Sequence, residues 1–272
     1  MSITKKIDFA LIIGVKKANP NGDPLNGNRP RVDYDGHGEI SDVCLKRKLR
    51  NRLMDKGEAI LVQSDDYRND DFRSIKDRYD ATLKEGEKTK DGEKKAKIAC
   101  STWYDVRAFG QVLAGVDDTS KSIAIRGPVS IQSAFSIEPV DVSSLQITKS
   151  VNLTTDKKDP SNKGSDTMGM KHRVDQGIYV TYGSINCQLA EKTGFSDEDA
   201  EKLKNAMLCL FENDESSARP SGSMEVVKVI WWTHKDKVVS SAKVHRSLIV
   251  NSDGTISLDT VDGVSVEELN GQ

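Results

Sequence analysis

The chain has 272 residues, 36% of them hydrophobic, and a formal net charge of −2 with a pI near 6.1. This length can bury a proper core, and the slightly acidic balance excludes a protein that coats nucleic acid through an overall positive charge. The four cysteines lack zinc-ribbon or disulfide-framework spacing, and no segment carries a signal-peptide cleavage site or the ~18 apolar residues that span a bilayer. We expect a cytoplasmic protein in which any nucleic-acid site is local.

The first predicted strand covers residues 7–15, where both faces are apolar. The next segment, ANPNGDPLNGNRPRVDYDGHGEI (residues 18–40), leaves the sheet because its prolines lack an N–H group and Asn-Gly favours positive φ. We expect a wide, irregular loop with free backbone N–H groups, which suits a phosphate backbone, although an ordinary exposed loop has the same turn residues. The candidate contacts are Asn19, Asn21, Gly22, Arg29 and Arg31.

A helix is predicted at residues 41–56, with Ser41 as a candidate N-cap. Leu45, Leu49 and Leu53 form one stripe for packing. The candidate cations on another flank are Lys46, Arg47 and Arg50. Charged helix faces are commonly just solvated, and that alternative stays open. The run LKRKLRNR contains no acidic residue, however, and this favours an anionic partner.

The middle of the chain combines a polar stretch with a packing segment. Residues 64–98 hold ten acidic and ten basic residues and include KEGEKTKDGEKKAK (84–97), which cannot supply a core. They predict an exposed insertion that is partly helical and partly mobile. In residues 100–115, apolar side chains recur at helical spacing and predict a helix packed on the core.

Within residues 123–140, alternating apolar residues predict a strand at 128–138, and Arg126 precedes it in an Arg-Gly-Pro sequence. That sequence allows a close approach of backbone and ligand, although a plain strand entry is the better explanation when the sequence is taken by itself. Residues 141–175 are polar and predict a projecting flexible loop or ribbon. Met168 and Met170 have no core of their own there, so they either fold back on the body or form an apolar wedge for a partner or between bases.

The last third predicts a strand at 177–189, a capped helix at 196–212, a linker that exposes Arg219, a strand at 223–233 and a hairpin at 237–250. Without the insertions the order is βαββαβ. This predicts an α+β, ferredoxin-like (RRM-like) fold, in which four antiparallel strands are backed by two helices. The aromatic signature of RNA-recognition domains is absent, so the sheet face is not expected to read single bases.

Several separated motifs carry a family resemblance. They are NPNGDP, SDVCLKRKLRNR, DVRAFGQVL, IRGPVSIQSAFSIEPV, TMGMKHRV, KTGFSDED and FENDESSARPSGSM. Together they resemble the Csd/Csh branch of the Cas7 proteins, the guide-RNA-binding backbone subunits of CRISPR Cascade complexes, most closely those of type I-C. The resemblance runs from about residue 7 to residue 234.

The resemblance implies one palm domain over residues 1–272, with a finger insertion at 64–115 and a thumb at 141–175. It places Ser41, Lys46 and Arg50 at guide-phosphate contacts, with Arg29 and Arg31 in the basic segment before them. Met168 or Met170 would be the wedge of the thumb, in the matching motif that also contains Lys171. The implied partners are CRISPR guide RNA, target DNA paired with the guide, further copies of the chain, other Cascade subunits and a recruited helicase-nuclease, with no membrane.

Two alternative functions are a metal-dependent RNA endonuclease and a protein-binding scaffold. Relatives of this type in RNA-cutting complexes use an aspartate in the first loop, which makes Asp23 the candidate for a metal-dependent RNA endonuclease, but no paired acidic motif accompanies it. A protein-binding scaffold would assemble without RNA. The four histidines show neither metal spacing nor a Ser/His/Asp order, and no nucleotide-binding glycine motif occurs. We therefore expect no catalytic residue, metal or cofactor.

Overall fold

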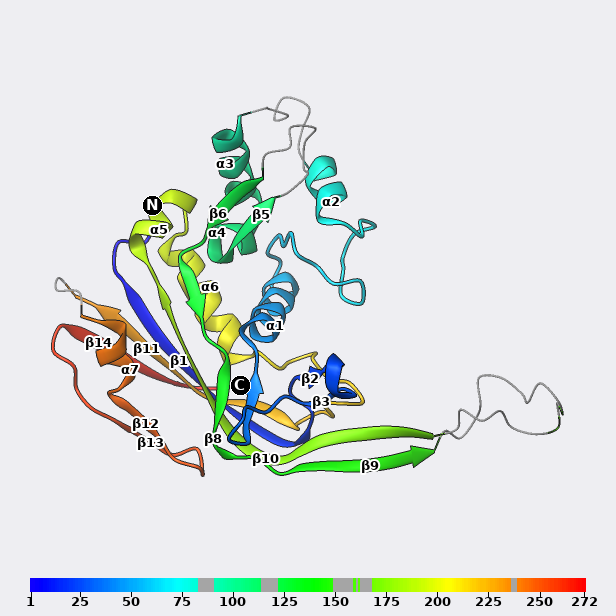
Figure 1. Ribbon diagram of the computed structural model, residues 1–272. Coiled ribbons are helices and arrows are strands. Elements are labelled where there is room, and N and C mark those ends of the chain that lie inside the picture. The colour runs from blue at the N-terminus through cyan, green and yellow to red at the C-terminus, as the bar shows by residue number, and fades with distance from the viewer. Residues whose placement is uncertain (83–90, 114–121, 149–158, 160, 162–167, 236–238) are drawn as a thin grey trace.

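The computed structural model describes residues 1–82, 91–113, 122–148, 159, 161, 168–235 and 239–272. Its centre is a sheet of eight strands: β1 (Ile7–Ala18), β4 (His37–Ile40), β7 (Val129–Ile131), β8 (Ala134–Pro139), β9 (Val142–Thr148), β10 (Met168–Ile185), β11 (Met224–His234) and β14 (Val264–Asn270). The order is β14-β11-β1-β10-β8-β4, and β7 and β9 also pair with β10 (Figure 1). All these pairs are antiparallel, so the predicted α+β class is confirmed.

β1 lies in the middle of this sheet. Ile7 pairs with Ile185 of β10 on one side and with Thr233 of β11 on the other. Residues 7–15 are all buried, which explains why both faces of the strand are apolar. The strand ends at Ala18, three residues beyond the predicted end, because Lys16 and Ala18 still pair with β10.

Two helices, α1 (Asp42–Asp55) and α6 (Asp197–Leu208), cover one face of the sheet. Leu45, Leu49 and Leu53 have no exposed surface, which confirms the predicted packing stripe of α1. Burial of one such side chain contributes about 1.5–3 kcal/mol to stability, so the stripe fixes the helix on the sheet. In α6, Ser196 and Asp199 form the predicted capping box.

The opposite face is covered by the C-terminal segment, which packs Val244 against Ala10 and Trp232 of the sheet. This segment contains α7 (Ser241–His245) and a hairpin of β12 (Leu248–Val250) and β13 (Ile256–Leu258). The prediction of a hairpin at 237–250 was wrong, because the described part of its first half is helical and β12 pairs with the later β13. The sequence also did not predict β14, which adds an edge strand beside β11.

A buried polar cluster joins this segment to β1. Asp8 has no exposed surface, and its Oδ2 lies 2.7 Å from Nε2 of His234 and 3.2 Å from Nζ of Lys6. Because Nδ1 of His234 accepts a hydrogen bond from the Val239 N–H, Nε2 carries the proton and donates it to Asp8. Nε2 of His245 lies 3.6 Å from the other carboxylate oxygen.

Burial alone would raise the pKa of Asp8, but the contacts with His245, Ser241, His234 and Lys6 outweigh it and hold this pKa well below its usual range. No local motif reveals this Asp-His pair, because Asp8 and His234 are 226 positions apart.

A second, smaller core lies mainly within residues 64–115. The segment at 64–98, predicted as an exposed insertion, contributes one fully buried apolar side chain to it, Tyr79. The elements of this core are α2 (Ile75–Thr82), α3 (Gly92–Thr102), α4 (Tyr104–Phe109), β5 (Gly110–Leu113) and the following β6 (Ile123–Arg126). Tyr79 of α2 stacks on Trp103 with ring centroids 5.4 Å apart. The single helix predicted over 100–115 was wrong, because the backbone is extended at Trp103 and left-handed at Gly110 (φ 77°).

Two predicted strands have different bounds in the structure. The strand at 128–138 is divided into β7 and β8, and after the break Ala134 is buried whereas Phe135 is 43% exposed. The strand predicted at 177–189 begins at Met168 and ends at Ile185. Asn186 then caps a short helix, α5 (Cys187–Thr193), so the last predicted strand residues are helical.

β9 and the first half of β10 form an antiparallel ribbon that extends away from the body of the sheet (Figure 1). Met168 pairs with Thr148 at the far end of the described ribbon, and Val174 pairs with Val142 at its root. The connection at 149–167 lies almost wholly outside the described residues. In the described part of the chain, no helix is long and apolar enough to cross a membrane.

Candidate nucleic-acid interface

The segment after β1 is a tight hairpin rather than the wide, irregular loop that was predicted. β2 (Gly22–Asp23) pairs with β3 (Arg29–Pro30), and a single 3-10 turn, η1 (Pro24–Asn26), connects them. Gly27 and Asn28 both have φ near 59°, as the Asn-Gly signal indicated. A Cβ atom at Gly22 would lie 2.0 Å from Oδ1 of Asn28, so a larger residue at this position would displace the Asn28 side chain.

Two asparagines of this hairpin fix its position. Asn19 is buried, and its Nδ2 donates a 2.7 Å hydrogen bond to the Asn28 carbonyl oxygen. Oδ1 of Asn21 accepts hydrogen bonds from the backbone N–H (2.9 Å) and the hydroxyl (2.8 Å) of Ser41. Ser41 is the N-cap of α1, so the hairpin is bonded directly to the start of the basic helix.

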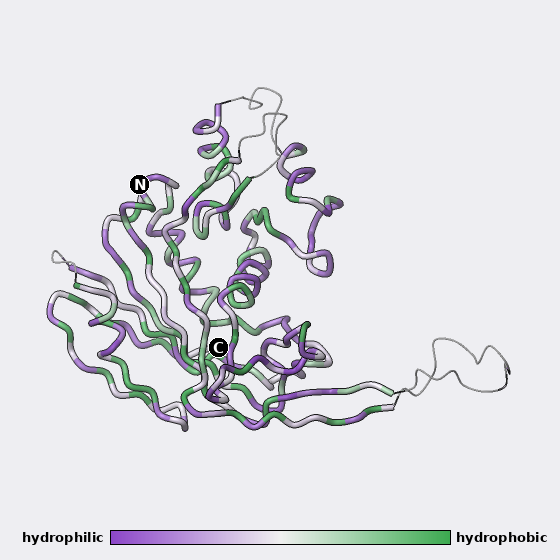
Figure 2. The backbone as a smooth tube through the Cα atoms, in the orientation of Figure 1, coloured by the Kyte–Doolittle hydropathy of each residue, from purple (hydrophilic) through white to green (hydrophobic). Residues whose placement is uncertain are grey.

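The three predicted cations of α1 all have carboxylate partners. Nζ of Lys46 lies 3.0 Å from Asp42, and a guanidinium nitrogen of Arg47 lies 2.7 Å from Asp66. α1 is mostly hydrophilic along its length in Figure 2. The Arg47 side chain is exposed and the Lys46 side chain is half-buried. An exposed ion pair is worth little in water, so a phosphate can replace either carboxylate at small cost.

Arg50 differs from its two neighbours. Its Nε lies 3.0 Å from Oδ2 of Asp105, and the side chains are only 13% and 1% exposed. The Arg50 guanidinium also lies 5.2 Å from the ring centroid of Phe109. The structure therefore places Arg50 against α4, whereas Lys46 and Arg47 lie at the surface.

Arg29 connects the hairpin to the ribbon. One of its guanidinium nitrogens donates a 2.8 Å hydrogen bond to Oγ of Ser144 in β9, and Nδ1 of His172 in β10 lies 2.9 Å from the same oxygen. Arg31 lies nearby in sequence, 3.6 Å from Asp23. The sequence did not identify Ser144 or His172, because neither residue type nor spacing marks them.

The two faces of the ribbon carry different side chains. By the β9–β10 register, Met168, Met170 and His172 share the face that reaches Arg29, and the methionines are 65% and 56% exposed. Lys171 lies on the opposite face, where it pairs with Leu145. The structure therefore groups the two methionines with the hairpin and separates Lys171 from them.

The linker with Arg219 also packs beside the hairpin. The Ala218 carbonyl oxygen accepts a hydrogen bond from the Asn19 N–H. Asp214 pairs with Nε of Arg219 (2.8 Å) and with the buried Lys48 of α1. Lys48 was not predicted as part of this region, although it follows Leu45 by three positions and so lies next to the buried stripe. Arg126 is exposed on β6, in the unit with the second core, and lies apart from this group.

Asp23, the candidate catalytic residue of the endonuclease alternative, has a local structural role. Its Oδ1 accepts a 3.2 Å hydrogen bond from the Leu25 N–H as the cap of η1 and lies 3.6 Å from Arg31. Among the residues that the structure describes, no group of three or more His, Cys, Asp or Glu side chains is placed to hold a metal ion.

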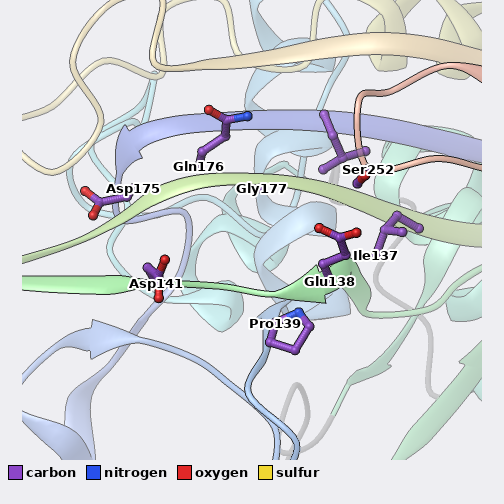
Figure 3. Close-up of a pocket in the computed structure, with 9 residues that line it drawn as sticks. Ile137, Glu138, Pro139, Asp141, Asp175, Gln176, Gly177 and Ser252 are labelled. Atoms are coloured by element: carbon purple, nitrogen blue, oxygen red, sulfur yellow. The ribbon is translucent and has the colours of Figure 1, made fainter.

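A cavity of about 240 Å³ lies at the root of the ribbon, and Figure 3 shows its lining. Three of its residues, Glu138, Asp141 and Asp175, are acidic, and none is basic. Like charges repel a phosphate group, so this cavity does not belong to the cationic surface formed by the hairpin and α1.

The chain is similar in sequence and in structure to known proteins. Residues 5–266 match the family model described as CRISPR-associated protein Cas7. A protein of Haloferax volcanii named CRISPR-associated protein Cas7 is 26% identical over 236 residues, which cover 82% of this chain and 68% of that protein. A chain of a solved CRISPR RNA-guided surveillance complex in a pre-nicking state is 18% identical, covers 92% of this chain and 84% of its own length, and superposes with a TM-score of 0.55.

Proposed function

The chain belongs to the Cas7 family, and from this we propose that it is a non-catalytic subunit that binds CRISPR guide RNA in an RNA-guided surveillance complex. The main support for this proposal is that the hairpin, the start of α1 and the ribbon are joined by hydrogen bonds into one surface. Asn21 bonds the hairpin to Ser41 of α1, and Arg29 bonds the hairpin to Ser144 of the ribbon. These contacts bring the hairpin, the start of α1 and the methionine face of the ribbon together.

The chemistry of this surface favours phosphate contacts over base reading. Its cations are Arg47, which is exposed, and four half-buried side chains: Arg29, Arg31, Lys46 and Arg219. Lysine and arginine bind the phosphate backbone without regard to sequence. A subunit that accepts any guide must do this and leave the base edges free to pair with the target. Met168 and Met170 then serve as the wedge that inserts between bases at one position per subunit.

A ferredoxin-like palm is the fold we infer for the central sheet. Supporting this, β11, β1, β10 and β8 are neighbours in that order, and α1 and α6 follow the first and third of the four predicted strands. We assign the fingers to residues 64–115, which have their own core, and the thumb to residues 141–175, whose described part is the ribbon.

The wider assembly is also a proposal. We infer a type I-C Cascade complex of the Csd/Csh branch in the prokaryotic cytoplasm, in which copies of this chain polymerise along one guide RNA beside other subunits. Target DNA reaches the complex by pairing with the guide, and a recruited helicase-nuclease cuts it. The near-neutral net charge of −2 supports polymerisation, because adjacent copies do not repel one another strongly.

The purified protein provides the direct test. After nuclease treatment and size-exclusion chromatography, we expect the assembled fraction to absorb more at 260 nm than at 280 nm and to release short RNA of uniform length. An assembled fraction free of RNA would support the scaffold alternative, and magnesium-dependent RNA cleavage would support the endonuclease alternative.

A further inference from the structure

β14 forms one edge of the central sheet, at the side opposite to β4 (Figure 1). It pairs with β11 over seven residues, from Val264 to Asn270, without a shift of register. Among the residues that the structure describes, no other strand pairs with its outer side. Open edges are commonly protected by a bulge, a proline or lysines, and β14 has none of these. The strand is therefore free to pair with another strand.

The register shows which backbone groups of β14 face outward. The Lys235 N–H donates a 2.9 Å hydrogen bond to the carbonyl oxygen of Gly263, the residue before β14. The Gly271 N–H, just after β14, bonds to β11 in the same way. Such bonds involve every second residue of an antiparallel pair, so the odd-numbered residues of β14 bond to β11. Val266 and Glu268 therefore direct their N–H and carbonyl groups to the open side.

A small apolar pocket lies on one face of this edge. Its apolar walls are Trp232 of β11, Leu258 and Val261 of the segment before β14, and Val264 and Val266 of β14. Trp232 and Val261 are buried, whereas Val266 is 46% exposed. The volume is about 160 Å³, well below the roughly 300–1,000 Å³ of small-molecule sites. The pocket therefore suits a single apolar side chain rather than a separate ligand.

The surroundings of the pocket are acidic. Asp259 and Glu268 also line it, and residues 258–272 contain four acidic and no basic residues. Among the described residues, no cation lies within salt-bridge distance of Asp259 or Asp262, and both are exposed. Glu268 lies 3.5 Å from Lys228, in a partly exposed pair that another cation can replace at small cost. These charges favour a basic partner.

The same charges argue against a second copy of the chain as the partner. β14 contains two glutamates and no cation, so two copies of this strand would add negative charge to negative charge, and like charges on paired strands destabilise them. A basic strand from another protein has no such penalty.

We propose that the open edge of β14 binds an extended basic segment of another protein as an added strand. Its backbone pairs with the outward groups of Val266 and Glu268, and one apolar side chain enters the pocket. Because side chains alternate between the two faces of a strand, the neighbours of that apolar residue lie on the other face, beside the exposed Glu267. The partner therefore alternates apolar and basic residues. This surface is separate from the cationic surface of the hairpin and α1.

The test uses the full chain, purified with any RNA that it carries. Two fluorescein-labelled peptides of equal composition are the probes: Lys-Val-Lys-Ile-Lys-Val-Lys alternates, and Lys-Lys-Val-Ile-Val-Lys-Lys does not. Because both peptides carry the same charge, the second one measures binding to RNA or to acidic surfaces in general.

Two variants of the edge separate the backbone contact from the charge. Val266→Pro removes an outward N–H and no bond to β11, since proline is tolerated at such positions of an edge strand. Asp259→Lys/Asp262→Lys reverses two charges beside the pocket. The matched control is Asp71→Lys/Asp80→Lys, which reverses two exposed carboxylates in the unit with the second core.

By fluorescence anisotropy, we expect the Kd of the alternating peptide to rise about tenfold in each edge variant and to change less than about twofold in the control. The non-alternating peptide should bind Val266→Pro like the wild type and the charge variant like its control. Equal binding of the alternating peptide to Val266→Pro and the wild type would overturn the strand pairing. RNA-independent self-association of the wild type that Val266→Pro abolishes, without peptide binding, would assign the edge to a second copy instead.

Folding of the variants is checked by their thermal midpoints, which we expect to lie within about 4 °C of the wild type because no bond between β14 and β11 is removed. If Val266→Pro is less stable than this, Asp259→Lys/Asp262→Lys decides, and an unchanged Kd for the alternating peptide overturns the proposal. Guide binding is tested separately by Lys46→Ala/Arg47→Ala on α1, so a failure of one inference leaves the other intact.

Discussion

Oδ1 of Asn21 accepts two hydrogen bonds from Ser41, one from its backbone N–H at 2.9 Å and one from its hydroxyl at 2.8 Å. The Ser41 hydroxyl also accepts a bond from the Cys44 N–H at 3.3 Å. One side-chain oxygen thus orients the cap of α1 and fixes the hairpin relative to the cationic helix. The start of α1 and the hairpin are therefore expected to behave as one unit.

Replacement of Asn21 by alanine removes both bonds and leaves the Ser41 N–H without this acceptor. We expect the free energy of unfolding to fall by about 1–3 kcal/mol, measured as a lower urea midpoint with an unchanged m-value. The control is Asn26→Ala in the exposed η1 turn, with an expected change within about 0.5 kcal/mol. Equal midpoints for the two variants would contradict the role of Asn21.

Removal of the two surface cations of α1 should weaken RNA binding without sequence preference. For Lys46→Ala/Arg47→Ala we expect affinity to fall equally for unrelated guide sequences, and the salt slope to flatten by about 0.7 for each lost phosphate contact. Filter binding at several salt concentrations measures both quantities. A loss confined to particular guides would mean that these side chains read bases.

Arg50 is expected to act mainly on stability. Arg50→Ala leaves the carboxylate of Asp105 buried without its cation, which typically costs about 3–5 kcal/mol. The Leu61 and Val62 N–H groups still donate to Asp105, so we expect a value near the lower end of that range. Urea denaturation gives the value, and Arg47→Ala, whose side chain is 51% exposed, is the matched control. A normal midpoint with weak RNA binding would instead make Arg50 a phosphate contact.

Asp8 should make stability depend on pH in the acidic range. Its pKa is lowered on folding, so its contribution is fully present above the unfolded value of about 3.9 and is lost as the pH falls through the folded pKa. We expect the stability difference between the wild type and Asp8→Asn to be constant from pH 7 to about 5 and to shrink below about pH 4. Urea midpoints at each pH provide the measurement, and a difference that grows in acid would reverse the assignment.

The exposed methionines of the ribbon should affect the guide but not the fold. For Met168→Ser/Met170→Ser we expect a free energy of unfolding within about 0.5 kcal/mol of the wild type. Chemical probing of bound RNA should show regularly spaced reactive bases that disappear in this variant. The control is Leu145→Ser/Ile147→Ser, which changes exposed apolar residues on the opposite face of the same ribbon. An unchanged pattern would assign the distortion to the hairpin and the sheet.

Asp23→Ala tests the endonuclease alternative directly. We expect the assembled protein to bind RNA and to leave it uncut in magnesium buffer, with or without this substitution. Gel analysis of labelled RNA after incubation provides the measurement. Cleavage by the wild type that is lost in Asp23→Ala would overturn the non-catalytic proposal.

Periodicity predicted the elements that bury one apolar stripe. The leucine stripe of α1 and the apolar β1, which is buried on both faces, were predicted because buried side chains recur with the period of the helix or strand. Element boundaries that depend on the backbone angles of one residue could not be predicted from the sequence. Helix α4 ends at Phe109 and β5 begins at Gly110. The strand predicted at 128–138 is interrupted after Ile131, and Phe135 of the second part is exposed. Residues 100–115 were expected to pack on the core, but their partner Tyr79 was not recognised because it lies in a highly charged segment.

The site could be predicted only as a set of residue types. The sequence placed Asn21, Ser41 and Arg29 in one region, but their roles depend on contacts between distant positions. Ser144 lies 115 positions from Arg29, and Asp105 lies 55 positions from Arg50. No local pattern reveals that Arg50 is buried against Asp105 while Arg47 is at the surface.

The central position of β1 has a consequence for biosynthesis. β1 leaves the ribosome first, but its neighbours in the sheet are β10, which ends at Ile185, and β11, which ends at His234. At about 5–20 residues per second, translation takes on the order of 10–45 s to reach the end of β11. Until β10 and β11 have both been synthesised, the largely apolar segment 7–15 lacks at least one of its two partner strands, and such exposed strands aggregate. Folding in the cell should therefore depend on chaperones that bind the nascent β1, and slower translation should lower the yield of native protein.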